Sequence, residues 1–86
     1  MSRRLTFTQE AWEDYLYWQN HDKQMLKKLN QLLKDCQRSP LEGIGKPEPL
    51  KGDLSGAWSR RVNDEHRLVY VVSDNEIKIL ACRYHY

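Results

Sequence analysis

The spacing of apolar residues changes once along the chain, and this change limits the fold more than any other feature. From residue 22 to residue 38 the apolar side chains recur at helical spacing, at Met25, Leu29, Leu32, Leu33 and Cys36. This pattern predicts one helix with a single apolar face, capped by Asp22. From residue 58 the period is two, in "WSRRV", "HRLVYVV" and "EIKILACRYHY", with turn signals at "NDE" and "SDN". That part predicts three antiparallel strands joined by short hairpins.

The segment before residue 22 predicts a strand followed by a first helix. "LTFT" (residues 5–8) is short and β-prone, and Thr8 can cap a helix that ends near Asn20 and His21. In this helix, Trp12, Tyr15 and Trp18 fall near helical spacing and are expected in the core between helix and sheet. The order β-α-α-β-β-β predicts an α+β fold, with two N-terminal helices on one face of a mainly antiparallel sheet.

An irregular connector separates the helical and extended halves. "SPLEGIGKPEP" (residues 39–49) holds three prolines and two glycines in eleven residues, so it cannot continue a helix. It carries three charged residues, Glu42, Lys46 and Glu48. The following "PLKGDLSG" predicts a short strand or turn before the sheet.

Size and composition bound the class of protein. A chain of 86 residues predicts a single domain spanning 1–86, and a net charge of +2 is too small to establish a polyanionic partner. Cys36 and Cys82 form no C-x-x-C pair, and the N-terminus has no apolar signal region. No segment approaches the roughly 20 apolar residues of a membrane span. The expectation is a cytoplasmic protein with reduced thiols and no membrane partner.

Chemically capable residues gather toward the C-terminal end. Alternation predicts that the last strand runs to Tyr86, so that the terminal residues are held by it. Phosphate loops of Walker type, metal-ligand spacings and nucleophile elbows are absent from the sequence. The remaining groups are one carboxylate, two imidazoles and several cations: Glu48, Lys51, Arg60, Arg61, His66, Arg67, Arg83 and His85.

This set suits RNA cleavage through the substrate's own 2′-hydroxyl, without a metal or cofactor. Such a reaction needs a base, an acid and cations that stabilise the charge on phosphorus. Each residue also has a plainer interpretation. His85 can be a surface histidine, Glu48 a solvated loop acid, and the strand arginines members of exposed ion pairs. His66, beside a turn, is expected to be structural.

A resemblance adds to this interpretation. The strings "WEDYLYWQ", "GKPEPLK", "WSRR", "EHRLVY" and "ACRYHY" cover much of the chain. On these strings the chain resembles the YoeB-like toxins of the RelE superfamily, which are ribosome-dependent messenger-RNA endonucleases. The resemblance implies a RelE-like fold and cleavage of mRNA in the ribosomal A site.

The resemblance also implies roles for six residues. Glu48 matches the family's general base, His85 its general acid, and Arg67 the arginine that stabilises the transition state. The residues expected near the scissile phosphate are Lys51, Arg61 and Tyr86.

The implied partners are a YefM-type antitoxin, the ribosome with its mRNA, and operator DNA bound as a toxin–antitoxin complex. A homodimer is an alternative to a monomer. Two other functions stay open: a ParE-like gyrase inhibitor, and a non-catalytic partner in an operator-binding complex. The cations of the second helix form either a solvated face or a polyanion contact: Lys23, Lys27, Lys28, Lys34 and Arg38.

Overall fold

A computed structural model describes residues 3–84 and confirms the predicted α+β order. The elements are β1 (Arg4–Phe7), α1 (Gln9–His21), α2 (Lys23–Arg38), β2 (Glu48–Pro49), the 3-10 helix η1 (Gly52–Leu54), β3 (Trp58–Arg61), β4 (Arg67–Val72) and β5 (Glu76–Ala81). The strands form one sheet in the order β1-β5-β4-β3-β2. The sheet is antiparallel except where β1 pairs with β5, which is a parallel pair.

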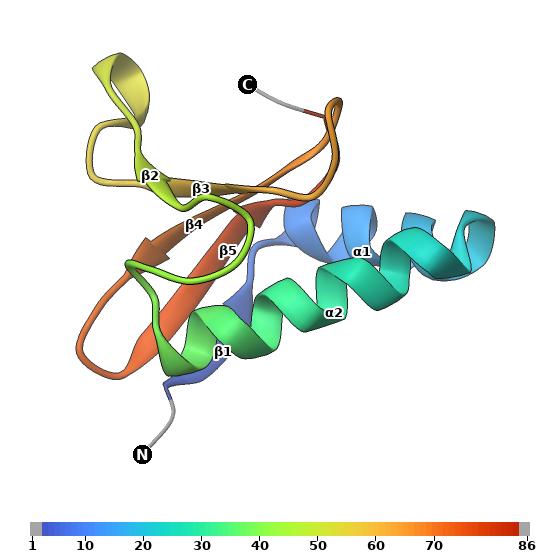
Figure 1. The fold of residues 1–86 in the computed structure, drawn as a ribbon, viewed down its shortest axis with the longest axis horizontal. Helices are drawn as coiled ribbons and strands as arrows, with labels where there is room; N and C mark the ends of the chain where they lie inside the picture. The colour runs from blue at the N-terminus through green and yellow to red at the C-terminus, as the bar shows by residue number, and fades with distance from the viewer. Residues whose placement is uncertain (1–2, 85–86) are drawn as a thin grey trace.

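Both helices lie on the same side of the sheet, as the sequence predicts (Figure 1). The Thr8 side chain accepts a hydrogen bond from the Ala11 N–H at 3.1 Å and begins α1. Asp22 ends α1 and begins α2, because its carboxylate accepts from the Met25 N–H at 3.1 Å. The two helices therefore follow one another with a single residue between them. Within the described range, no helix is long and apolar enough to cross a membrane.

The core lies between α2 and the centre of the sheet. The apolar face of α2 is buried at the predicted positions Leu29, Leu32, Leu33 and Cys36, and Ile77 and Ile79 of β5 are fully buried in the same cluster. The prediction for Trp12 is wrong, since its side chain is 45% exposed. Trp12 packs against Phe7 of β1, and among residues 3–84 no further strand lies beyond that edge of the sheet to cover it.

The prediction that the last strand continues to Tyr86 is wrong for residues 82–84. Strand β5 ends at Ala81, and it contains a bulge at Leu80. Leu80 has no paired residue in β4, because Ile79 pairs with Tyr70 and Ala81 pairs with Val69. The extra residue shifts the alternation, so that Cys82 is fully buried. Residues 85 and 86 lie outside the described part of the chain.

Candidate active site

Strand register brings three predicted site residues to one face of the sheet. Glu48 pairs with Ser59 across β2 and β3, and Arg61 pairs with Arg67 across β3 and β4. Directly paired residues point to the same face, and so do residues two apart in one strand. Glu48, Arg61 and Arg67 therefore share a face. It is the face away from the helices, because Arg60, between Ser59 and Arg61, points toward α2 and contacts Asp35.

Three of the predicted residues are accessible. Glu48 and Lys51 are exposed, with Lys51 directly before η1. The Arg61 side chain is 47% exposed, and its guanidinium lies 3.8 Å from the fully exposed carboxylate of Asp64. An exposed pair at this distance is weak. Arg61 can therefore turn from Asp64 to a phosphate at little energetic cost.

Arg67 is half-buried and already oriented. Its Nη1 donates to the carbonyl oxygens of Asn63 at 2.6 Å and His66 at 3.1 Å. Its backbone N–H donates to the Tyr84 carbonyl oxygen at 2.9 Å. Arg67 thus lies beside the end of the described chain. His85 and Tyr86, the remaining predicted residues, lie outside the described range.

A hollow of about 240 Å³ lies next to this group on the same face. Its floor includes Val69, which pairs with Ser59 on one side and Ala81 on the other. The full lining is Glu10, Leu54, Val69, Leu80, Ala81, Arg83 and Tyr84. The lining is mostly apolar, and Glu10, Arg83 and Tyr84 add polar groups to it.

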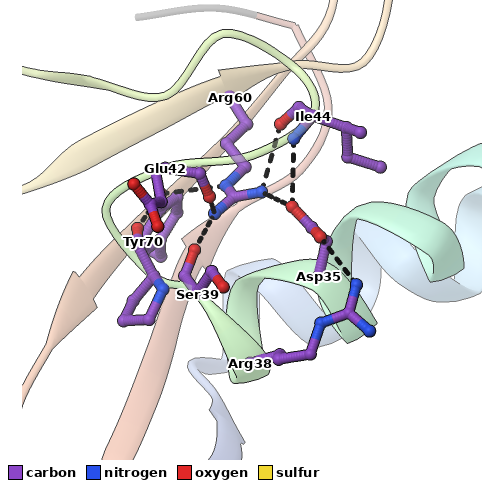
Figure 2. A network of polar contacts seen from close by, with 8 residues as sticks. Asp35, Arg38, Ser39, Glu42, Ile44, Arg60 and Tyr70 are labelled. Carbon is purple, nitrogen blue, oxygen red and sulfur yellow. Dashed lines mark hydrogen bonds and ion pairs between the residues drawn. The ribbon is translucent and has the colours of Figure 1, made fainter.

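Arg60, one of the chemically capable residues in the sequence, has a structural position. It is fully buried, and its Nη1 donates to Asp35 Oδ2 at 2.6 Å and to the Ile44 carbonyl oxygen at 3.1 Å (Figure 2). Its Nη2 donates to the carbonyl oxygens of Ser39 and Glu42. A buried guanidinium is tolerated when its donors are paired in this way.

The Arg60 network extends to Tyr70 and lowers the pKa of Asp35. Arg60 Nε donates to the Tyr70 hydroxyl at 3.1 Å, and that hydroxyl donates to the Pro40 carbonyl oxygen at 2.7 Å. The hydrogen bond from Arg60 holds the pKa of Asp35 below its usual value. Burial raises the pKa of Tyr70 to about 12, so it remains a hydrogen-bond donor at neutral pH.

The connector of residues 39–46 is thereby fixed to the sheet and leads directly to Glu48. The Gly45 carbonyl oxygen accepts from the Arg61 N–H at 2.6 Å. The next residue, Lys46, has a φ of 52°. A non-glycine residue adopts this left-handed conformation when its surroundings impose it. The sequence predicted an irregular loop here, and it missed Asp35 as the residue that anchors the loop.

A basic groove joins Arg61 to α2. The groove has a volume of about 250 Å³ and is lined by Lys28, Gln31, Leu32, Ile44, Gly45, Lys46 and Arg61. A neighbouring surface carries Lys23, Lys27 and Lys34. In residues 3–84, no group of three or more His, Cys, Asp or Glu residues could hold a metal ion.

Comparisons with known proteins agree on one family. Residues 7–86 match the family described as "YoeB-like toxin of bacterial type II toxin-antitoxin system". The chain is 60% identical to Toxin YoeB of Escherichia coli (strain K12) over 83 residues, covering 96% of this chain and 99% of that protein.

Two solved structures from Staphylococcus aureus are similar over the full length. One is a YoeB dimer, with a TM-score of 0.92, 57% identity and 100% coverage of both chains. The other is a heterotetrameric YoeB–YefM toxin–antitoxin complex, with a TM-score of 0.90, 57% identity and 100% coverage of both chains.

Proposed function

The chain belongs to the YoeB-like toxin family of bacterial type II toxin–antitoxin systems, and from this membership we propose that it is an endoribonuclease that cleaves mRNA in the ribosomal A site. The observation that supports this most is the shared face of Glu48, Arg61 and Arg67. Arg67 in turn contacts Tyr84, the residue before His85. These contacts support a proposal in which the base, the cations and the acid act together.

In the proposed reaction, Glu48 takes the proton from the 2′-hydroxyl of the substrate. The 2′-oxygen attacks the adjacent phosphorus, and the bond from phosphorus to the 5′-oxygen breaks. His85 donates a proton to that leaving oxygen, while Arg67 stabilises the negative charge that develops on the phosphate. The phosphate is bound by Lys51, Arg61 and Tyr86. No metal or cofactor takes part in these steps.

The ribosome presents the substrate in this proposal, and the lysines of α2 bind ribosomal RNA. The exposure of Lys27, Lys28 and Lys34 and the groove that leads from Lys28 to Arg61 support this. Replacing these three lysines with Ala should weaken ribosome binding and reduce its dependence on salt, because fewer phosphates are neutralised. The matched control is Lys78→Ala, an exposed lysine on β5. Unchanged affinity and salt slope in the triple variant would contradict this docking surface.

The antitoxin and oligomeric state follow from the relatives. Because the Staphylococcus aureus proteins are described as a YoeB–YefM complex and a YoeB dimer, we propose that this chain binds a YefM-type antitoxin and can form a homodimer. In the proposal it contacts operator DNA as part of the toxin–antitoxin complex. Light scattering of the chain alone and after co-expression with its antitoxin measures both assemblies.

The decisive experiment is mRNA cleavage by the purified protein, mapped by primer extension with and without translating ribosomes. Cuts should occur at A-site codons when ribosomes are present. Glu48→Ala and His85→Ala should each lower the rate by roughly 10²–10⁴-fold. Glu42→Ala is the matched control, because the exposed Glu42 lies in the same connector and contributes its backbone carbonyl to the Arg60 network.

Two results would overturn the proposal. Full activity of the folded Glu48→Ala and His85→Ala variants would remove the acid–base assignment. Absence of cleavage by wild-type protein on translating ribosomes would remove the activity. A gyrase supercoiling assay would then test the ParE-like alternative.

A further inference from the structure

The chain beyond β5 is held by contacts that lie outside the sheet. After Ala81, the Cys82 carbonyl oxygen accepts from Trp18 Nε1 at 2.9 Å, and the Cys82 N–H donates to Asp14 Oδ2 at 3.1 Å. Both partners belong to α1. The backbone at Cys82 is therefore fixed by helix α1 rather than by the sheet.

Tyr84 is fixed from the other side, by Arg67, which begins β4, and by His66, the residue before it. Its N–H donates to His66 Nδ1 at 2.6 Å, and its carbonyl oxygen accepts from the Arg67 N–H at 2.9 Å. Tyr84 has a φ of 61°. This conformation disfavours a non-glycine residue by roughly 1–2 kcal/mol and persists where surrounding contacts impose it.

His66 is built to accept this hydrogen bond. Its side chain is buried, 7% exposed as a residue, with the ring edge-on to Trp18 at a centroid distance of 4.7 Å. A second contact is with the Tyr84 ring, at a centroid distance of 5.1 Å. When Nδ1 accepts, the proton of the neutral ring is on Nε2, which lies 3.6 Å from Glu65 Oε1. The nearby carboxylate favours that tautomer.

The backbone around His66 is itself fixed. Its N–H donates to Asn63 Oδ1 at 2.7 Å, and its carbonyl oxygen accepts from the Val62 N–H at 3.0 Å. The same carbonyl oxygen accepts from Arg67 Nη1. The turn that orients the Arg67 guanidinium therefore also orients the imidazole that holds Tyr84.

We propose that His66 is a positioning residue, whose Nδ1 sets the backbone of Tyr84 and thereby the position at which the next residue, the proposed acid His85, is joined to the chain. The carbonyl group of Tyr84 belongs to the peptide bond that leads into His85. The effect of His66 on catalysis rests on the proposed function, whereas the hydrogen bond from Tyr84 to His66 does not. His66 itself does not touch the reacting atoms in this proposal.

Two variants separate the hydrogen bond from the packing of the ring. In His66→Asn the side-chain oxygen can occupy the place of Nδ1 and accept from Tyr84. In His66→Gln the amide extends toward the place of Nε2. Both variants lose the contact with Trp18 and are neutral, so their thermal stabilities should fall by similar amounts. His21→Asn, on an exposed histidine of α1, is the control for both measurements.

The first measurement is hydrogen exchange at the Tyr84 amide of the full chain, and the second is the cleavage rate on ribosomes. Wild type and His66→Asn should protect the Tyr84 amide, while His66→Gln should lose at least tenfold in protection. His66→Gln should also lose about 10–100-fold in kcat with little change in KM, because small displacements of a catalytic group lower the chemical step. His66→Asn should recover most of that loss.

Each outcome tests a separate part of the proposal on His66. Retained protection and kcat in His66→Gln would overturn the inference. Equal losses in both variants would also overturn it, since ring packing would then be what matters. If wild type does not cleave RNA while Tyr84 protection still depends on the acceptor at position 66, the proposed function fails and the backbone role of His66 stands.

Discussion

Two adjacent arginines have different roles because their side chains lie on opposite faces of the sheet. Arg60 and Arg61 are neighbours in β3, so they point to opposite faces of the sheet. Arg60 is fully buried and its guanidinium contacts Asp35, Tyr70 and three backbone carbonyl oxygens. Arg61 is half-exposed on the face of the candidate site. The pair "RR" thus combines a buried structural cation with a half-exposed one.

Removing Arg60 should strongly destabilise the fold. Arg60→Ala leaves the Tyr70 hydroxyl and the connector carbonyls without their donor, and loss of one partner in a buried ionic network lowers the free energy of unfolding by roughly 3–5 kcal/mol. Arg38→Ala is the matched control, because Arg38 contacts the same Asp35 with a side chain that is 80% exposed. Its effect should stay within about 0.5 kcal/mol. Urea denaturation measures both, and equal effects would contradict the structural role of Arg60.

The two thiols should make the fold sensitive to alkaline pH. Both cysteines are free and buried, and burial raises the pKa of Cys36 to about 11 and that of Cys82 to about 12. Unfolded thiols ionise near pH 8.5. Above that pH the unfolded chain releases protons that the folded chain retains, so the free energy of unfolding should fall.

Denaturation curves from pH 7.5 to pH 10 would measure how the free energy of unfolding falls with pH. The Cys82→Ala variant should show a smaller fall. Thiol reagents should label the native protein slowly at pH 7.5 and the unfolded protein quickly, because the thiolate is the reactive form. Rapid labelling of the native protein would contradict the burial of both thiols.

At the scale of elements, side chains from a helix and from the sheet supply most of the hydrogen bonds that order the connector of residues 39–46. Asp35 of α2 accepts from the Ile44 N–H at 3.0 Å, and Arg60 of β3 donates to three of the connector's carbonyl oxygens. The loop therefore has the conformation that a helix and a strand impose on it. Such a loop can hold Lys46 at a fixed position and leads to Glu48 at the start of β2.

Gly43 in this connector should be more sensitive to substitution than Gly56, which lies outside it. A Cβ atom at Gly43 would lie 2.0 Å from Asp35 Oδ2, and its φ is 116°. Gly56 has a φ of 97° but nothing within 4 Å of an added Cβ. Both Ala variants carry the backbone strain, and only Gly43→Ala also displaces Asp35. Gly43→Ala should therefore lower the free energy of unfolding by at least about 1 kcal/mol more than Gly56→Ala in urea denaturation. Equal effects would show that Asp35 can move without loss.

The sequence predicted the elements with local signals and missed those set by distant contacts. Thr8 and Asp22 carry cap chemistry in their own side chains, and the apolar face of α2 repeats at helical spacing, so these features were predicted correctly. The bulge at Leu80 and the end of β5 depend on pairing with β4 and on Trp18, which lie far away in sequence. Alternation also cannot tell which of Arg60 and Arg61 faces the core, because that depends on Asp35.

The candidate site, too, could be predicted only in part from the sequence. Strand register supports a common surface for Glu48, Arg61 and Arg67, but their roles come from the resemblance to the toxin family and stay predictions. His66 was expected to be structural from its place beside a turn. Its hydrogen bond with Tyr84 is visible once the fold brings residues 66 and 84 together.

At the scale of the whole molecule, one core joins the helices and the sheet. Buried residues from α1, α2, β4 and β5 belong to a single cluster. A chain built in this way should unfold as one cooperative unit. Far-UV circular dichroism and tryptophan fluorescence should give the same urea midpoint, because the three tryptophans belong to α1 and β3. Two separate transitions would contradict the prediction of a single domain.

The place of β5 in the sheet has a consequence for how the protein is made. Strand β5 comes last in sequence among the described elements, yet it lies between β1 and β4. A growing polypeptide can therefore form the α1–α2 hairpin early, while β1 has no neighbour until translation has passed residue 81. The sheet is therefore complete only after β5, the last of the described strands, has been synthesised.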